Sequence, residues 1–123
     1  MADLKKPPRV TGIAHFFAAA GYSAGGLRRL WHEAAFRHEM LGLVAMPVAL
    51  ALFGATLTHY LVFAGLALLV IALEALNTAI ECIVDHLTQD WAIFARDAKD
   101  LGSLAVLCGL LCHVLLLVHV ILT

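Results

Sequence analysis

The chain has 123 residues, of which 63% are hydrophobic and 14% are charged, and its formal net charge is -1. Soluble domains carry about 25% charged residues, and one small core cannot bury so much apolar surface. These values exclude an ordinary soluble domain and predict an integral membrane protein. The near-zero net charge also argues against nucleic acid as a partner.

Residues 10–31 are predicted to form an amphipathic helix after a polar, basic segment over residues 1–9. Apolar side chains recur there every three or four residues, which is typical of a helix with one apolar face. We expect this helix to lie in the plane of the membrane surface, broken or bent near the adjacent glycines Gly25 and Gly26. Trp31 at its end suits the headgroup layer.

Three apolar stretches follow and predict three transmembrane helices, over residues 40–57, 60–84 and 101–122. The first is shorter than the roughly 20 residues that usually cross a membrane, and Pro47 inside it can kink a helix. His59 and Tyr60 are expected to mark a tight turn between the first two helices. We therefore predict a single all-α, membrane-embedded domain over residues 1–123.

The eight lysine and arginine residues lie only in the first 37 residues and in a polar connector over residues 85–100. Because basic residues are retained on the cytoplasmic side, we expect the amino terminus and this connector to be cytoplasmic. Glu33 and Glu39, which precede the first apolar stretch, then share a membrane side with the acidic residues that end the second.

The second apolar stretch ends in a polar stripe. At about 100° per residue, one helix face carries Glu74, Asn77, Thr78, Glu81 and Asp85. A carboxylate in the membrane costs on the order of 2.5–3.5 kcal/mol on insertion scales, so such residues are usually retained for a function.

Three interpretations of the stripe stay open. One carboxylate would bind a divalent cation while another acts as a general base; the two would form a proton or ion path; or they would be buried acids paired with Lys99 or Arg37. Convergence with Glu33 and Glu39 favours the first interpretation. Lys99 itself is either an interfacial anchor or a phosphate contact.

Five segments together resemble the prokaryotic diacylglycerol kinase family. They are Ala-Ala-Gly-Tyr-Ser (19–23), Gly-Leu-Arg (26–28), Glu-Ala-Ala-Phe-Arg-His-Glu (33–39), Glu-x-Leu-Asn-Thr-Ala-Ile-Glu-x-x-Val-Asp (74–85) and Ala-Lys-Asp-x-Gly-Ser (98–103). The resemblance covers the chain from about Thr11 to its end. It implies a surface helix plus three transmembrane helices in a homotrimer of the bacterial inner membrane, with each active site between neighbouring chains at the membrane–cytosol boundary. The implied reaction transfers the γ-phosphate of ATP, with Mg²⁺, to the primary hydroxyl of diacylglycerol and gives phosphatidate.

The same resemblance implies a role for each motif residue. Glu74 would be the general base, oriented by Asn77, and Glu33 and Glu81 would hold the magnesium ions that bridge the ATP phosphates. The nucleotide-binding residues would be His15, Tyr22, Glu33, Glu81, Asp90, Trp91, Lys99 and Asp100. The lipid-binding residues would be His15, Trp31, Glu39, Glu74 and Ser103.

The sequence departs from the family pattern in four places. His15 and Ala18 stand where the family has basic residues, so a permanent positive charge near the phosphates becomes pH-dependent at His15. One residue rather than two separates Trp31 from Glu33, which shifts the register between the surface helix and the first span. Residues 89–92 read Gln-Asp-Trp-Ala in place of a Glu-Tyr-His segment.

Two alternatives to a diacylglycerol kinase remain at this point. The lipid substrate would be another membrane alcohol such as undecaprenol, which related small kinases of this fold use. Or the chain would be a non-catalytic membrane assembly factor or an ion-conducting bundle built on the same acidic stripe. Glu33 together with Lys99 favours the kinase, because an ion path needs neither residue.

Overall fold

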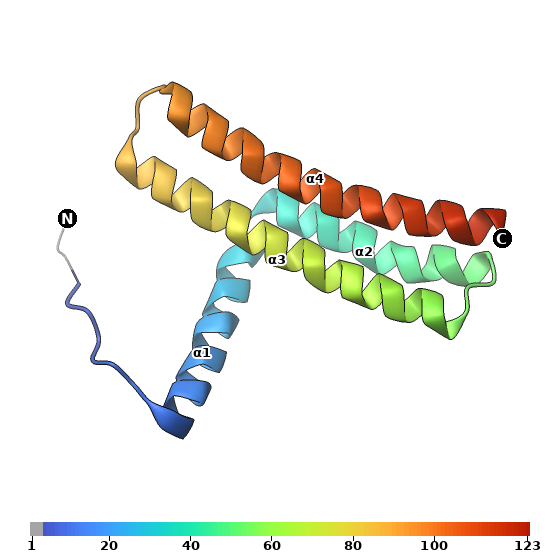
Figure 1. Ribbon diagram of the computed structural model, residues 1–123, viewed down its shortest axis with the longest axis horizontal. Coiled ribbons are helices and arrows are strands. Elements are labelled where there is room, and N and C mark those ends of the chain that lie inside the picture. The colour runs from blue at the N-terminus through green and yellow to red at the C-terminus, as the bar shows by residue number, and fades with distance from the viewer. Residues whose placement is uncertain (1–3) are drawn as a thin grey trace.

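The computed structural model describes residues 4–123, and this part of the chain forms four α-helices. They are α1 (Gly12–Trp31), α2 (Ala34–Leu52), α3 (Leu57–Leu87) and α4 (Ile93–Leu122). In Figure 1, α2, α3 and α4 run side by side as a long bundle, and α1 leaves the bundle near the start of α2. The paired ends of α3 and α4 extend past the start of α2 (Figure 1).

The all-α prediction is confirmed, and α2, α3 and α4 are long and apolar enough to cross a membrane. Large apolar side chains stay exposed on the outer faces of these helices, as at Leu41, Val44 and Leu115. Such a surface suits a lipid environment, because in water a contiguous apolar patch of this extent is rare.

α4 packs on α3 through one stripe of its surface. Its buried residues alternate at spacings of four and three and are Gly102, Val106, Gly109, His113, Leu116 and Val120, after Ala95 in the first turn. Two glycines in this stripe, Gly102 and Gly109, lie in close contact with side chains of α3, as small residues at helix contacts do in membranes. A Cβ at Gly109 would lie 3.0 Å from Leu73 Cδ1 and 3.1 Å from Val70 Cγ2.

At the end of the bundle where α2 meets α3, Leu50 packs with Leu116 and Val120 in a fully apolar cluster. Partly buried side chains of α2 and α3, among them Met46 and Phe63, complete this cluster. This apolar cluster therefore lies at one end of the bundle, and the polar stripe of α3 lies toward the other.

The expected break in the first helix is wrong, because α1 continues through Gly25 and Gly26 without interruption. Neither glycine has a positive φ. A glycine inside a helix costs only about 1 kcal/mol relative to alanine, and the good helix formers around this pair maintain the helix.

The expected turn at His59 and Tyr60 is also wrong, because both residues lie in the first turn of α3. The chain reverses earlier, at Gly54, whose φ of +75° lies in the left-handed region that favours glycine. The imidazole of His59 instead caps α3, since its Nδ1 accepts a hydrogen bond from the Thr56 backbone N–H at 3.0 Å.

The polar segments are more helical than hydropathy suggested. Glu33 is the N-cap of α2, and the connector expected over residues 85–100 shortens to residues 88–92 because α3 continues to Leu87 and α4 begins at Ile93. Hydropathy marks where a helix meets polar surroundings, whereas the backbone stays helical until a capping residue or turn ends it.

Candidate active site

Glu74 lies on the buried face of α3 with only 6% of its surface exposed. Glu39, one and a half turns into α2, is within hydrogen-bonding reach of its carboxyl, and Glu33 is the next acidic group. The Glu39 Oε2 atom is buried and has no hydrogen-bond partner within residues 4–123. Two carboxyls this close repel one another unless a proton or a cation lies between them.

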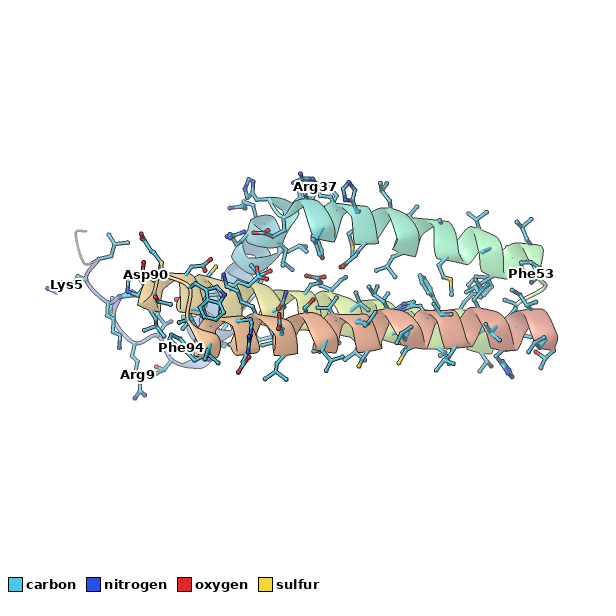
Figure 2. The ribbon with its side chains drawn as sticks, turned by 90° about the horizontal axis from the view of Figure 1, so that it is seen from above. Lys5, Arg9, Arg37, Phe53, Asp90 and Phe94 are labelled. Carbon is cyan, nitrogen blue, oxygen red and sulfur yellow. The ribbon has the colours of Figure 1, made fainter. Side chains whose placement is uncertain are left out.

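Neither basic residue considered as a partner for Glu74 pairs with it. Lys99 donates to Asp85 Oδ1 at 2.6 Å. Arg37 donates through Nη1 to the Trp31 carbonyl at 2.7 Å and lies on the side of α2 away from α3 and α4 (Figure 2). The third interpretation of the stripe, as buried acids paired with these two cations, is therefore wrong for Glu74 in the described chain.

Asn77 and Glu81 lie one turn apart and contact each other, as their spacing of four residues requires. The Asn77 Nδ2 atom donates to Glu81 Oε1 at 3.4 Å. Its Oδ1 atom is buried and unpartnered among the described residues, and it lies against Gly102 of α4. Lys99, on the next turn of α4, has Asp85 and Glu81 as its acidic neighbours.

Two of the residues predicted to bind lipid, Glu39 and Ser103, line a cavity of about 480 Å³ between α2 and α4. Glu39, Asp100 and Ser103 make its polar part, and four apolar residues of α4 extend it to Leu110. The cavity is therefore polar next to the acidic stripe and apolar farther along α4.

A smaller cavity of about 290 Å³ lies where α3 and α4 are joined. Asp85, Asp90 and Lys99 line it, and two of these, Asp90 and Lys99, are among the residues predicted to bind the nucleotide. Trp91 is exposed and lies under Arg96, whose guanidinium carbon is 5.9 Å from the centre of its ring.

His15 and Tyr22 are not brought to Glu74 within one chain. They line a separate cavity of about 550 Å³ with residues 7–12, on the part of α1 that points away from the bundle (Figure 1). Trp31, by contrast, lies at the α1–α2 junction and packs edge-on against Phe36 with ring centres 6.3 Å apart.

Arg29 is a residue near the site that sequence reasoning missed. Its Nη1 atom donates to Glu33 Oε1 at 2.6 Å, and its Nη2 atom lies 3.8 Å from Cys82 Sγ on α3. The hydrogen bond to Glu33 raises the pKa of Arg29 above its usual value. The spacing of four residues between Arg29 and Glu33 was the available signal.

No group of three or more histidine, cysteine, aspartate or glutamate side chains within residues 4–123 is arranged to hold a metal ion. Glu33 and Glu81 therefore belong to different small clusters in the single chain, Glu33 beside Arg29 and Glu81 beside Asn77.

The fold and this site define a class of protein, a small α-helical membrane protein with carboxyl groups buried at one end of its bundle. Residues 21–121 match the family model described as prokaryotic diacylglycerol kinase. The chain therefore belongs to the prokaryotic diacylglycerol kinase family, a family of lipid kinases, as its motifs indicated.

Similar proteins named diacylglycerol kinase come from several bacteria. One from a Sinorhizobium species is 52% identical over 98 residues, which are 80% of this chain and 72% of that protein. One from Escherichia coli strain K12 is 39% identical over 107 residues, covering 85% and 87% of the two chains. One from Helicobacter pylori strain J99 is 35% identical over 120 residues, covering 90% and 88%.

Proposed function

We propose that this chain transfers the γ-phosphate of ATP to the primary hydroxyl of diacylglycerol and so forms phosphatidate at the membrane–cytosol boundary. The observation that carries the proposal is Glu74, a buried carboxyl without a basic partner among residues 4–123, in a chain of this kinase family. A base for a lipid hydroxyl has to lie where that hydroxyl lies, at the edge of the apolar layer.

Glu74 would accept the proton of the lipid hydroxyl as that oxygen attacks the γ-phosphorus. Proton transfer of this kind contributes about 10²–10⁴-fold to a rate. Asn77 lies one turn along the same face of α3 and would orient the acidic groups through its bond to Glu81. Family membership favours this role over an ion path along the same stripe.

Phosphoryl transfer depends mainly on alignment and on neutralising the phosphate charge. Lys99 would provide positive charge to the phosphates, with Asp90, Trp91 and Asp100 beside it on α4 and the α3–α4 connection. In the single chain, Lys99 is held by Asp85, an exposed pair that solvent screens and that a phosphate can replace.

Magnesium fits the donor set, with Glu33 and Glu81 as the residues that would hold it. Magnesium in kinases is bound by one or two carboxylates plus phosphate oxygens rather than by an all-protein cage. Two buried oxygens, Glu39 Oε2 and Asn77 Oδ1, have no hydrogen-bond partner among the described residues and would be further oxygen ligands for a metal ion. When bound, the metal would neutralise charge on the ATP phosphates.

The cavity between α2 and α4 suits the lipid substrate. Glu39 and Ser103 would face the glycerol part, and the apolar side chains toward Leu110 would face an acyl chain. Trp31 and His15 would contact lipid from α1.

A homotrimer in the bacterial inner membrane accounts for the residues that one chain leaves apart. His15 and Tyr22 lie away from Glu74 within a chain, so a shared nucleotide site needs α1 to reach a neighbouring copy. The amino terminus and the 88–92 connection would face the cytosol, where the basic residues gather and ATP is present.

Purified protein in mixed micelles with ATP and Mg²⁺ tests the proposal, with dioleoylglycerol and undecaprenol as parallel substrates. We expect phosphatidate from dioleoylglycerol, and loss of product in Glu74→Gln. Product only from undecaprenol would assign the polyprenol instead. No phosphorylated product from either lipid would overturn the kinase proposal.

A further inference from the structure

Arg29 connects three helices at one point of the acidic site. It lies in the last turn of α1, donates to the N-cap residue of α2, Glu33, and reaches Cys82 on α3. Cys82 follows Glu81, the other proposed metal ligand, directly in sequence. The guanidinium thus links the helix that carries Glu33 to the helix that carries Glu74 and Glu81.

This ion pair is not a core contact. The side chains of Arg29 and Glu33 are 50% and 38% exposed, and exposed pairs of this spacing contribute little to stability. Each charge also suits its own helix end, a cation in the last turn of α1 and an anion at the start of α2. The ion pair between Arg29 and Glu33 therefore mainly fixes the position of the Glu33 carboxylate and adds little to the stability of the fold.

The contact leaves half of the carboxylate available. Arg29 donates to Oε1, and Oε2 receives no hydrogen bond within residues 4–123. Residues that do not touch a metal ion often orient a ligating carboxylate by binding one of its oxygens, while the other oxygen stays free for the metal. The planar guanidinium can hold Glu33 and contact Cys82 at the same time, which a lysine ammonium does less well.

We propose that Arg29 is a positioning residue that fixes Glu33 against α3 so that its free oxygen can bind the divalent cation. The inference rests on the proposed function, because Glu33 is a metal ligand only there. It adds a residue outside the expected site, and it would hold the proposed ligands on α2 and α3 in register.

Mn²⁺ binding followed by electron paramagnetic resonance, with a non-hydrolysable ATP analogue present, tests this role apart from turnover. We expect Arg29→Gln to weaken Mn²⁺ binding about tenfold, the lower end of the effect of losing an orienting partner. At saturating Mg²⁺ its kcat should return to within about twofold of the wild type, since both carboxylates remain. Arg29→Lys should recover part of the affinity.

Two reference variants separate this proposal from its alternatives. Arg28→Gln removes the same charge one residue away and should leave Mn²⁺ affinity within about twofold; an equal loss in both arginine variants would mean a general charge effect and overturn the proposal. Tighter Mn²⁺ binding in Arg29→Gln would mean that Arg29 competes with the metal, which also overturns it.

Glu33→Gln distinguishes failure of the inference from failure of the function. If Glu33→Gln loses Mn²⁺ and Arg29→Gln does not, the positioning role is wrong and the metal assignment stands. If Glu33→Gln binds Mn²⁺ normally, the metal assignment fails and the positioning role fails with it. If Arg29→Gln unfolds before it can be assayed, Mn²⁺ affinity is measured in Arg29→Lys and Arg29→Ala instead. Wild-type Mn²⁺ affinity in both of these variants would overturn the proposal.

Discussion

Asn77 on α3 lies directly against Gly102 on α4, and the contact leaves no room for a side chain at position 102. A Cβ there would overlap the Asn77 amide oxygen and lie 3.1 Å from its Cγ atom. The same amide donates to Glu81 on its other side. Gly102 therefore sets where Asn77 points, and through Asn77 the backbone of α4 supports the acidic stripe of α3.

Gly102→Ala should damage both catalysis and stability. The added methyl forces the Asn77 amide to rotate, which breaks its bond to Glu81 and disturbs the group proposed to orient the base. We expect kcat to fall about tenfold or more, with a loss of about 1–3 kcal/mol in unfolding free energy from overpacking. Turnover in mixed micelles and reversible unfolding in detergent measure the two effects.

Gly109→Ala is the matched control for this variant. Its Cβ would crowd the apolar atoms Leu73 Cδ1 and Val70 Cγ2 in the same helix pair, with no polar group involved. We expect a comparable loss of stability with kcat near the wild type. A parallel fall of kcat in both variants would show that general packing of α3 on α4 matters, rather than the Asn77 amide.

Relations within one helix could be predicted from the sequence, because the period of 3.6 residues determines them. Glu74 and Thr78 are buried and Asn77 and Glu81 are half-buried on the expected face of α3. The bond from Asn77 to Glu81 follows from the same spacing. Only Asp85, at the end of the stripe, is exposed.

Relations between helices could not be predicted, because hydropathy leaves their register open. The sequence offered Lys99 or Arg37 as partners for the acids of the stripe without fixing which acid each would meet. The structure places Lys99 on Asp85. The connection between α3 and α4 determines this register, and it covers residues 88–92 rather than the 85–100 expected from apolar boundaries. The contact between Arg29 and Cys82 is of the same kind, since 53 residues separate the partners.

Glu74→Gln should remove turnover and leave the fold intact. A glutamine cannot accept the hydroxyl proton, so we expect kcat to fall at least about 100-fold, within the range for loss of a general base. Because the change also removes repulsion between the Glu74 and Glu39 carboxyls, thermal stability should be equal or higher. Binding of the ATP analogue with Mg²⁺, measured by calorimetry, should stay within about threefold of the wild type. Wild-type turnover in this variant would contradict the base assignment.

Lys99→Met should weaken nucleotide binding while sparing the chemical step. The methionine keeps the apolar stem but cannot donate a charge-assisted hydrogen bond to phosphate. We expect the KM for ATP to rise about tenfold or more and kcat to change less. Asp85→Asn is the control, because it frees Lys99 from its only described ion pair, and it should leave KM for ATP equal or lower. If KM for ATP rose as much in Asp85→Asn as in Lys99→Met, the ion pair would matter for the structure of the site, and Lys99 would not be assigned as a phosphate contact.

Gly54→Ala should destabilise the protein without touching the site. Gly54 has a φ of +75° and open space around its Cα, so an added methyl meets no neighbour and the effect comes from the backbone alone. Holding a non-glycine residue in the left-handed region costs about 1–2 kcal/mol, which reversible unfolding should detect while KM and kcat stay near the wild type. Gly42→Ala is the control and should change the free energy of unfolding in the opposite direction. Gly42 lies inside α2, also with nothing near its Cβ position, and alanine there should raise stability by up to about 1 kcal/mol. If both alanines shifted stability in the same direction, the left-handed turn at Gly54 would not be what ends α2 and sets the register of α3 against it.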